Sequence, residues 1–220
     1  MPTERTAVVT GVSSGIGHAI ADRLQSDGWH VVGLSRTEPE LPITWYPCDL
    51  AGSFELPPVA AVDALVHAAG FQVSGRLGDL DPDDGARMYA VHVDAAVRLA
   101  AGLVDRLIDG GRIVLIGSRT ATGVAGKSQY AATKAALRAL ARSWAAELAP
   151  RRITANVVEP GPTDTAMLTD PARAATPPIT PPLGRLIRPD EIAALTAYLL
   201  SPDAAMLTGQ HLTICAGASL

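Results

Sequence analysis

The sequence has few of the residues that mark a secreted, disulfide-stabilised domain. Only two of its 220 residues are cysteines, Cys48 and Cys215, and they lie far apart in the chain. A small secreted domain held by disulfides carries a dense cysteine pattern at compact spacing. We therefore expect reduced thiols in a reducing compartment.

Long apolar runs and basic blocks are also missing. No stretch approaches the roughly 18 consecutive apolar residues that a transmembrane helix needs. The net charge is −4, which argues against a nucleic-acid-binding protein. The first residues contain no basic segment followed by a separate apolar one, so we expect no signal peptide. These absences together predict a cytoplasmic protein with no nucleic-acid or membrane partner.

Lysine is scarce. Of 18 basic residues only Lys127 and Lys134 are lysines, so arginine supplies nearly all of the positive charge. Arginine and lysine differ in shape and in the ease with which they lose a proton. Each lysine therefore invites a chemical explanation.

Hydrophobic residues make up 48% of the chain, enough for a sizeable core. Short apolar runs alternate with stretches of helical periodicity, which is typical of a parallel sheet covered on both faces. We predict one α/β domain over residues 1–220, a Rossmann-like doubly wound parallel sheet of about seven strands in the order 3-2-1-4-5-6-7. The expected strands are 6–10, 31–34, 43–46, 64–67, 112–117, 153–158 and 211–214, and the expected helices are 16–27, 82–108, 128–148 and 190–200.

Two segments depart from this alternation. Residues 48–63 contain Pro57-Pro58, so a helix there must be short or absent. Residues 167–188 contain five prolines and predict an irregular loop. Long loops in compact domains often cover a site, so we predict a substrate loop or lid there; a mobile surface loop is the alternative.

A glycine-rich loop lies between the first predicted strand and the first predicted helix. Its glycines permit a tight turn, close approach of backbone to a ligand and close helix–strand packing. The following helix N-terminus would present free N–H groups to a pyrophosphate. The motif thus predicts dinucleotide binding by Gly11, Ser13, Ser14, Gly15, Ile16 and Gly17.

The end of the second strand bears on which dinucleotide is bound. A site for NAD commonly places a carboxylate there to bind the ribose 2′-hydroxyl. This chain has Ser35 and Arg36 instead, with no acid before Glu38. A guanidinium and a hydroxyl suit a 2′-phosphate, so NADP(H) is preferred and NAD(H) remains possible. The alternative is that Arg36 is an ordinary solvated charge.

Tyr130 and Lys134 are four residues apart in a predicted helix and therefore share one face. A phenol normally has a pKa of ~10. A cation at ~4 Å and an effective dielectric constant of ~20 contributes about 4 kcal/mol, which lowers the pKa by roughly three. Such a phenol could act in general acid–base catalysis. Ser118 ends the fifth strand, where a hydroxyl could bind a substrate carbonyl.

These motifs together resemble the short-chain dehydrogenase/reductase family over essentially the whole chain. His67-Ala68-Ala69-Gly70 stands where the family usually has Asn-Asn-Ala-Gly. Further resemblances are Asp49-Leu50 (adenine), Pro160-Gly161 with Thr163 and Thr165 (nicotinamide), and Leu207-Thr208-Gly209-Gln210 before the last strand.

The resemblance implies a role for each catalytic residue. Tyr130 would exchange a proton with the reacting oxygen, and Ser118 would orient the carbonyl. Lys134 would bind the nicotinamide ribose and lower the pKa of Tyr130. Hydride would pass between nicotinamide and a small carbonyl or alcohol substrate.

The resemblance also implies a homodimer or homotetramer formed through the two long helices. The alanine-rich helix agrees weakly, with Leu137, Leu140 and Trp144 as larger contacts. A helix buried within one subunit would look similar.

One position departs from the family. His92 stands where the catalytic asparagine would fall. A neutral imidazole has one donor and one acceptor, so it could hold a water in the proton relay. A buried structural histidine is the equal alternative.

Three other functions compete with an NADP(H)-dependent reductase. One is an alcohol dehydrogenase that uses NAD. Another is a catalytically silent nucleotide sensor, which would not need Ser118, Tyr130 and Lys134 together. The third is a nucleotide-sugar epimerase or dehydratase, which usually has a larger C-terminal substrate domain. His18, His30 and His211 show no metal-ligand spacing, so no metal is expected.

Overall fold

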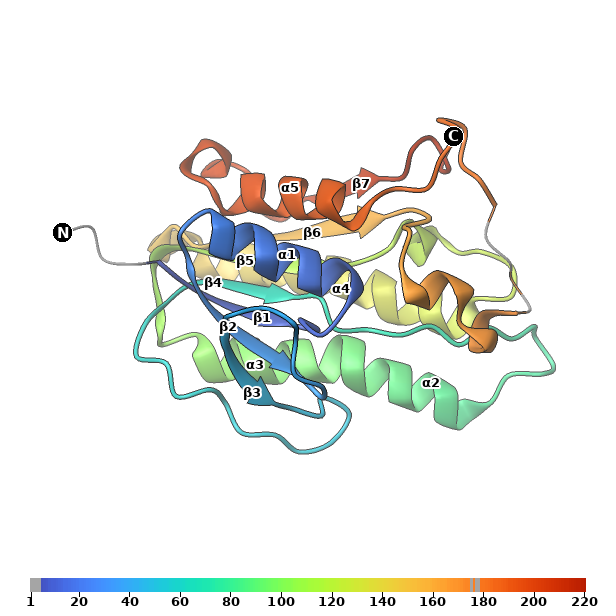
Figure 1. Cartoon of the computed structure of the whole chain (residues 1–220), viewed down its shortest axis with the longest axis horizontal. Helices are drawn as coiled ribbons and strands as arrows, with labels where there is room; N and C mark the ends of the chain where they lie inside the picture. The colour runs from blue at the N-terminus through green and yellow to red at the C-terminus, as the bar shows by residue number, and fades with distance from the viewer. Residues whose placement is uncertain (1–4, 175, 177–178) are drawn as a thin grey trace.

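A computed structural model describes residues 5–174, 176 and 179–220 and contains a seven-stranded parallel sheet (Figure 1). Its order, β3-β2-β1-β4-β5-β6-β7, confirms the predicted topology. All six strand pairs are parallel. The strands are β1 (Thr6–Thr10), β2 (His30–Ser35), β3 (Thr44–Pro47), β4 (Val62–His67), β5 (Leu107–Ile116), β6 (Thr154–Pro160) and β7 (His211–Ile214).

Successive side chains of each strand enter two separate cores, because side chains alternate across a sheet. In β1, Val8 packs on one face while Ala7 and Val9 pack on the other. The helices α3 (Ala95–Leu103) and α4 (Ser128–Leu148) cover the face of Val8. The helices α1 (Gly15–Ser26) and α5 (Pro189–Leu200) lie side by side on the other face (Figure 1).

The single helix predicted over 82–108 is wrong in two respects. The structure has α2 (Pro82–Tyr89), a π-helical turn η1 (Ala90–Asp94) and then α3. The helix ends at Leu103, and Leu107 already pairs with Val62 as the first residue of β5. Residues 104–106 form a turn, and residues 107–111 extend the fifth strand beyond its predicted start at residue 112.

The crossing from β3 to β4 contains no helix over residues 48–61, as its prolines predict. Arg98 of α3 holds it in place through Nη1 to Gly52 O (2.8 Å) and Nη2 to Leu50 O (3.1 Å). The Arg98 guanidinium also lies 4.4 Å from the centre of the Phe54 ring. Arginine contacts with backbone carbonyls thus fasten this irregular segment to the domain.

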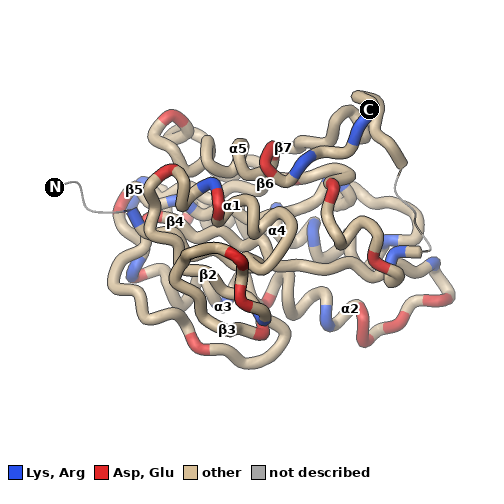
Figure 2. The backbone as a smooth tube through the Cα atoms, viewed as in Figure 1, with Lys and Arg blue, Asp and Glu red and all other residues tan. Residues whose placement is uncertain are grey.

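The carboxyl ends of the strands meet at one edge of the sheet, and the loops that leave them form the site. The described residues of the predicted loop 167–188 are irregular apart from the short 3₁₀ turns η4 (Ala166–Thr169) and η5 (Pro171–Arg173) and an isolated bridge from Ile187 to Thr163. Its residues Pro177 and Pro178 lie outside the described part. In the ranges described, none of the helices is both long and apolar enough to span a membrane. Figure 2 shows basic and acidic positions interspersed along the chain.

Candidate active site

A cavity of about 1180 Å³ opens at this edge of the sheet. That volume slightly exceeds the range of ~300–1,000 Å³ typical of small-molecule pockets. It is lined by segments that follow β1, β2, β4, β5 and β6. Among the predicted site residues, all but His92 line it: Gly11, Ser13, Ser14, Gly15, Ile16, Gly17, Ser35, Arg36, Asp49, Leu50, Ala69, Gly70, Ser118, Tyr130, Lys134, Pro160, Gly161, Thr163 and Thr165.

The glycine loop makes a turn that larger residues could not make. Gly11 has φ +73°, and a Cβ there would lie 2.9 Å from the backbone of Ala69. A Cβ on Gly17 would lie 2.3 Å from Gly11 O. The loop therefore holds α1 tightly against β1 and β4, and it places the N-terminus of α1 on the cavity.

The N-terminus of α1 has the features of an anion site. Its first turn contains no acidic residue, and the Ser14 side chain makes no capping hydrogen bond. The first N–H groups of a helix need acceptors from outside the helix. Gly15 has φ +59° and no side chain, so its backbone beside Thr165 is not covered by a Cβ. These features fit a dinucleotide pyrophosphate.

Arg36, predicted to contact the adenosine ribose, is exposed and lines the cavity directly after β2. Ser35 is less available than predicted. Its hydroxyl donates to Thr37 O (2.7 Å) and accepts from Trp45 Nε1 (3.0 Å), so its proton is not free for a phosphate. Arg36 alone supplies the charge that a 2′-phosphate would meet.

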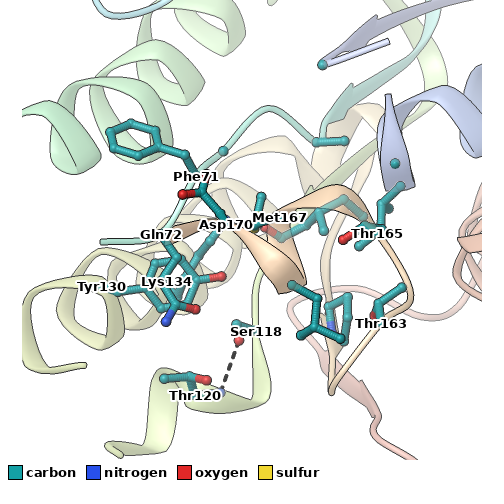
Figure 3. Close-up of a pocket in the computed structure, with 18 of the residues that line it drawn as sticks. Phe71, Gln72, Ser118, Thr120, Tyr130, Lys134, Thr163, Thr165, Met167 and Asp170 are labelled. Atoms are coloured by element: carbon teal, nitrogen blue, oxygen red, sulfur yellow. Dashed lines mark hydrogen bonds between the residues drawn. The ribbon is translucent and has the colours of Figure 1, made fainter. Parts of the chain in front are cut away.

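Ser118 and Tyr130 face each other across the inner part of the cavity. Ser118 Oγ accepts a hydrogen bond from Thr120 N (3.1 Å), which fixes the hydroxyl at the end of β5 (Figure 3). Its hydrogen bond to Tyr130 lowers the pKa of the phenol. Both side chains are buried. A carbonyl oxygen placed between them would meet two hydroxyl donors.

Lys134 lies beneath Tyr130 in α4, and its Nζ donates to Ile116 O (2.8 Å). Burial lowers the pKa of Lys134 to about 7. The predicted depression of the tyrosine pKa is wrong for these side chains. Burial raises the pKa of Tyr130, and Ser118 and Arg173 only partly offset that rise. Burial disfavours the charged form of both groups, the phenolate of Tyr130 and the ammonium of Lys134. With a pKa of about 7, Lys134 is about half neutral at pH 7 and cannot supply a full positive charge to lower the pKa of Tyr130.

His92 does not have the geometry of a water-holding relay residue. Its Nε2 accepts from Phe71 N (3.1 Å), and its Nδ1 lies 2.8 Å from Thr133 Oγ1. Thr133 Oγ1 donates to Tyr130 O (2.8 Å), so Nδ1–H of His92 must donate to Thr133. Both ring nitrogens are used, which corrects the relay prediction in favour of the structural alternative. The ring packs edge-on against Tyr130, with centroids 5.6 Å apart.

A second buried histidine ties the glycine loop to β4. Thr10 Oγ1 accepts from the backbone N–H groups of Ala68 and Ala69 (3.0 Å each) and lies 3.1 Å from His67 Nδ1. His67 Nε2 lies 3.0 Å from Val91 O, which only a ring N–H can satisfy. Burial lowers the pKa of His67 to about 3, so this histidine is neutral.

The segment after β6, predicted to contact the nicotinamide, lines the cavity. Gly161 N donates to Ile214 O (2.8 Å), and Thr163 Oγ1 donates to Gly161 O (3.0 Å). A Cβ on Gly161 would lie 2.7 Å from Cys215 Cα, so only glycine fits beside β7. The backbone therefore turns toward the cavity directly after Pro160.

The cavity is also lined by residues that sequence reasoning did not assign to it, among them Phe71, Gln72, Arg119 and Lys127. Figure 3 draws Phe71 and Gln72 together with Tyr130 among the residues that line the cavity. The scarcity of lysine singled out Lys127 but gave no site for it. Arg119 carries no sequence signal. Arg173 falls within the predicted substrate loop 167–188, although nothing in the sequence singled out its side chain.

Comparisons with known proteins agree with this geometry. A family model described as "Enoyl-(Acyl carrier protein) reductase" matches residues 58–219, and one described as "short chain dehydrogenase" matches residues 5–44. The chain belongs to the short-chain dehydrogenase/reductase family. As a member it is an oxidoreductase that binds a nicotinamide dinucleotide.

Several members of the family are similar along their whole length. The chain is 34% identical to the cyclic-di-GMP-binding biofilm dispersal mediator protein of Escherichia coli K12, covering 96% of each chain. It is 33% identical to the 3-oxoacyl-[acyl-carrier-protein] reductase FabG of Vibrio harveyi, over 97% of this chain and 96% of that protein. A crystal structure of a blue fluorescent protein from a metagenomic library, in complex with NADPH, is 31% identical, with a TM-score of 0.87 and 98% of each chain covered.

Proposed function

We propose that this protein transfers a hydride between NADP(H) and a small carbonyl compound or secondary alcohol, with Tyr130 as the general acid and base. The observation that carries the proposal is the meeting of Ser118, Tyr130 and Lys134 in the cavity that the glycine loop opens. A nucleotide-binding protein without chemistry has no need of all three groups at one place.

The residues have distinct tasks in reduction. Ser118, fixed by Thr120 N–H, donates to the carbonyl oxygen and orients it. Tyr130 is protonated at neutral pH because burial raises its pKa, so it is ready to give its proton to that oxygen. Lys134 holds its place through Ile116 O and faces the same cavity. NADPH, when bound, supplies the hydride.

Arg36 supports the preference for NADP(H). It is exposed beside the cavity, and within the described ranges no ion pair joins it to a carboxylate. A bidentate guanidinium is well suited to a phosphate. The similar blue fluorescent protein was solved with NADPH, which agrees with this assignment.

The substrate enters on the side of the loop 167–188 in this proposal. Met167, Leu168, Ile179 and Pro182 of that loop line the cavity. A homodimer or homotetramer also belongs to the proposal, and it rests on family membership. Of the contacts expected for it, Leu137 is buried in the subunit's own core, whereas Leu140 and Trp144 are only partly buried against that core.

The test is a carbonyl panel assayed by the loss of NADPH absorbance, with Tyr130→Phe as the matched variant. Removing the proton donor is expected to lower kcat/KM by ~10²–10⁴-fold while NADPH binding, followed by titration of its fluorescence, is retained. Equal rates for the two proteins would refute the role of Tyr130. NADPH binding without turnover of any carbonyl would refute the reductase assignment.

That last outcome would support a second candidate, nucleotide sensing without turnover. The similarity to the E. coli protein named as cyclic-di-GMP-binding favours it. Binding of cyclic di-GMP by this chain, measured by calorimetry with and without NADPH, distinguishes the two candidates. A sensor binds it tightly, whereas a dedicated reductase does not.

A further inference from the structure

Three cationic side chains from three different segments line the cavity next to the catalytic residues. Arg119 begins the 3₁₀ turn η2 (Arg119–Thr122) directly after Ser118. Lys127 stands immediately before α4, and Arg173 ends η5. We call Arg119, Lys127 and Arg173 the cation cluster. It has no part in the chemistry described above.

The cluster is not neutralised by nearby acids. In the part of the chain that the structure describes, no carboxylate lies within 4.0 Å of any of the three cationic groups. Asp170 lines the same part of the cavity, but its Oδ1 caps η5 by accepting from Ala172 N (2.8 Å). Asp170 keeps its negative charge in this role: burial lowers the pKa of Arg173, and the charge of Asp170 partly offsets that effect. Three positive charges thus share their end of the cavity with one negative charge.

Arg173 has a buried donor atom that lacks an acceptor. Its Nη1 donates to Met167 O (3.1 Å), whereas its buried Nε has no hydrogen-bond partner among the residues that the structure describes. A buried N–H without an acceptor costs about 1–3 kcal/mol. A native protein retains such a group where something else supplies the acceptor.

The three cations are close enough to repel one another. The pKa of Lys127 is lowered to about 8, first by burial and then by the charges of Arg173 and Arg119. The loops nevertheless hold them together. Gly75 N donates to Gly126 O (3.0 Å), and Ser74 N donates to Ala172 O (3.0 Å). The cluster is therefore a built arrangement rather than three independent surface charges.

The cluster also lies near the reacting hydroxyl. Burial raises the pKa of Tyr130, and the charge of Arg173 partly offsets that rise. Burial lowers the pKa of Arg173, and Tyr130 partly offsets that fall. The phosphate-binding helix α1 and Arg36 belong to the other end of the site, beyond β1 and β2. A group held by the cluster would consequently belong to the substrate and not to the dinucleotide.

We propose that the cation cluster is a subsite for an oxyanion, a carboxylate or a phosphate, carried by the carbonyl substrate a few bonds from the reacting carbon. The inference rests on the proposed reductase function and specifies its substrate class as oxo acids or phosphorylated ketones. Guanidinium and ammonium groups bind such oxygens through charge-assisted hydrogen bonds, and the anion would give Arg173 Nε its missing acceptor.

The experiment compares an oxo acid with its methyl ester, and dihydroxyacetone phosphate with dihydroxyacetone, as substrates with NADPH. We expect kcat/KM of the unmodified protein to be at least about tenfold higher for the charged member of one pair, equivalent to ~1.4 kcal/mol. A preference within the oxo acid pair identifies a carboxylate, and a preference within the dihydroxyacetone pair identifies a phosphate. Equal kcat/KM within both pairs overturns the inference and leaves the reductase function standing.

Variants of the cation cluster test whether it causes the preference for the charged substrate. Lys127→Met and Arg173→Met should each reduce the ratio of charged to neutral kcat/KM by about tenfold, and Lys127→Arg should restore most of it. The matched control is Arg142→Met, an exposed arginine of α4 outside the cavity, which should leave the ratio unchanged. A ratio that survives both cluster variants would place the anion elsewhere and overturn the inference.

A binding assay keeps the inference separate from the reductase function. Malonate and inorganic phosphate are titrated calorimetrically into the protein saturated with NADPH. At least tenfold weaker binding to Lys127→Met or Arg173→Met supports the subsite even if no carbonyl is turned over. Binding that is absent, or equal in all variants, overturns it.

Discussion

Lys134 should make the stability of the cofactor-free protein depend on pH in a direction opposite to that of a typical paired lysine. The side chain is 4% exposed, and burial lowers its pKa from 10.5 to about 7. In the unfolded chain it keeps its ordinary pKa. Between the two values the unfolded state binds more protons than the folded state, so stability rises with pH.

The expected magnitude follows from the two pKa values. At pH 7 the folded lysine is about half protonated while the unfolded one is fully protonated, and each pH unit in this range is worth up to about 1.4 kcal/mol. Integrating from pH 7 to pH 9 gives a gain in the free energy of unfolding of about 2 kcal/mol from this residue. Below pH 7 the gain levels off.

The assay is urea unfolding at pH 7 and pH 9 without cofactor, for the unmodified protein and for Lys134→Met. Methionine has a similar length and no charge, so the difference between the two pH dependences isolates the lysine. We expect the unmodified protein to gain about 2 kcal/mol more than the variant. Parallel pH dependences would show that Lys134 keeps its ordinary pKa and would refute the reasoning.

Three further predictions concern the rest of the site. Arg36→Asp should shift the preference from NADPH toward NADH in steady-state kinetics, and an unchanged preference would show that Arg36 does not contact the 2′-phosphate. Gly17→Ala should lower both the melting temperature and the affinity for NADPH, because its Cβ would lie 2.3 Å from Gly11 O; a protein that binds NADPH normally would contradict this. In His92→Asn the shorter side chain keeps only one of the hydrogen bonds to Phe71 N and Thr133 Oγ1, so urea unfolding should show a loss of about 1–3 kcal/mol of stability. Equal stability would contradict the structural role of these two hydrogen bonds.

Local patterns were enough to predict the sheet and the dinucleotide motif. The strand β1 and the glycine loop are contiguous in sequence, and their conformation follows from residues that are neighbours along the chain. Tyr130 and Lys134 share one helix face because four residues make about one turn. The strand order then followed from the handedness of parallel crossovers. Prediction succeeded where the conformation depends on residues that are neighbours along the chain.

Prediction failed where several elements meet. The π-helical turn Ala90–Asp94 leaves no mark in the hydrophobic pattern, because one extra residue in a turn still reads as helix. The direction of the Tyr130 pKa depends on burial by the loops around it, which no spacing of two residues reveals. The hydrogen bonds of Ser35 depend on Trp45 from the next strand.

The state of His92 is a further example. Its two partners come from a loop and from α4, so the sequence left relay and structural roles equally open. Because Thr133 Oγ1 donates to Tyr130 O, it must accept from His92, and this places the proton of the imidazole on Nδ1. Convergence of distant segments likewise produced the cation cluster, whose members are separated by up to 54 residues between Arg119 and Arg173.

The crossing between β3 and β4 has a consequence for how this domain can change. Arg98 and Arg106 donate hydrogen bonds to the main-chain oxygens of Leu50, Gly52 and Pro57. Every amino acid carries this acceptor. Recognition of that kind is indifferent to side-chain identity. Substitutions at Gly52 and Pro57 can therefore leave these hydrogen bonds in place, whereas Leu50 and Phe54 are constrained by the side chains they pack against.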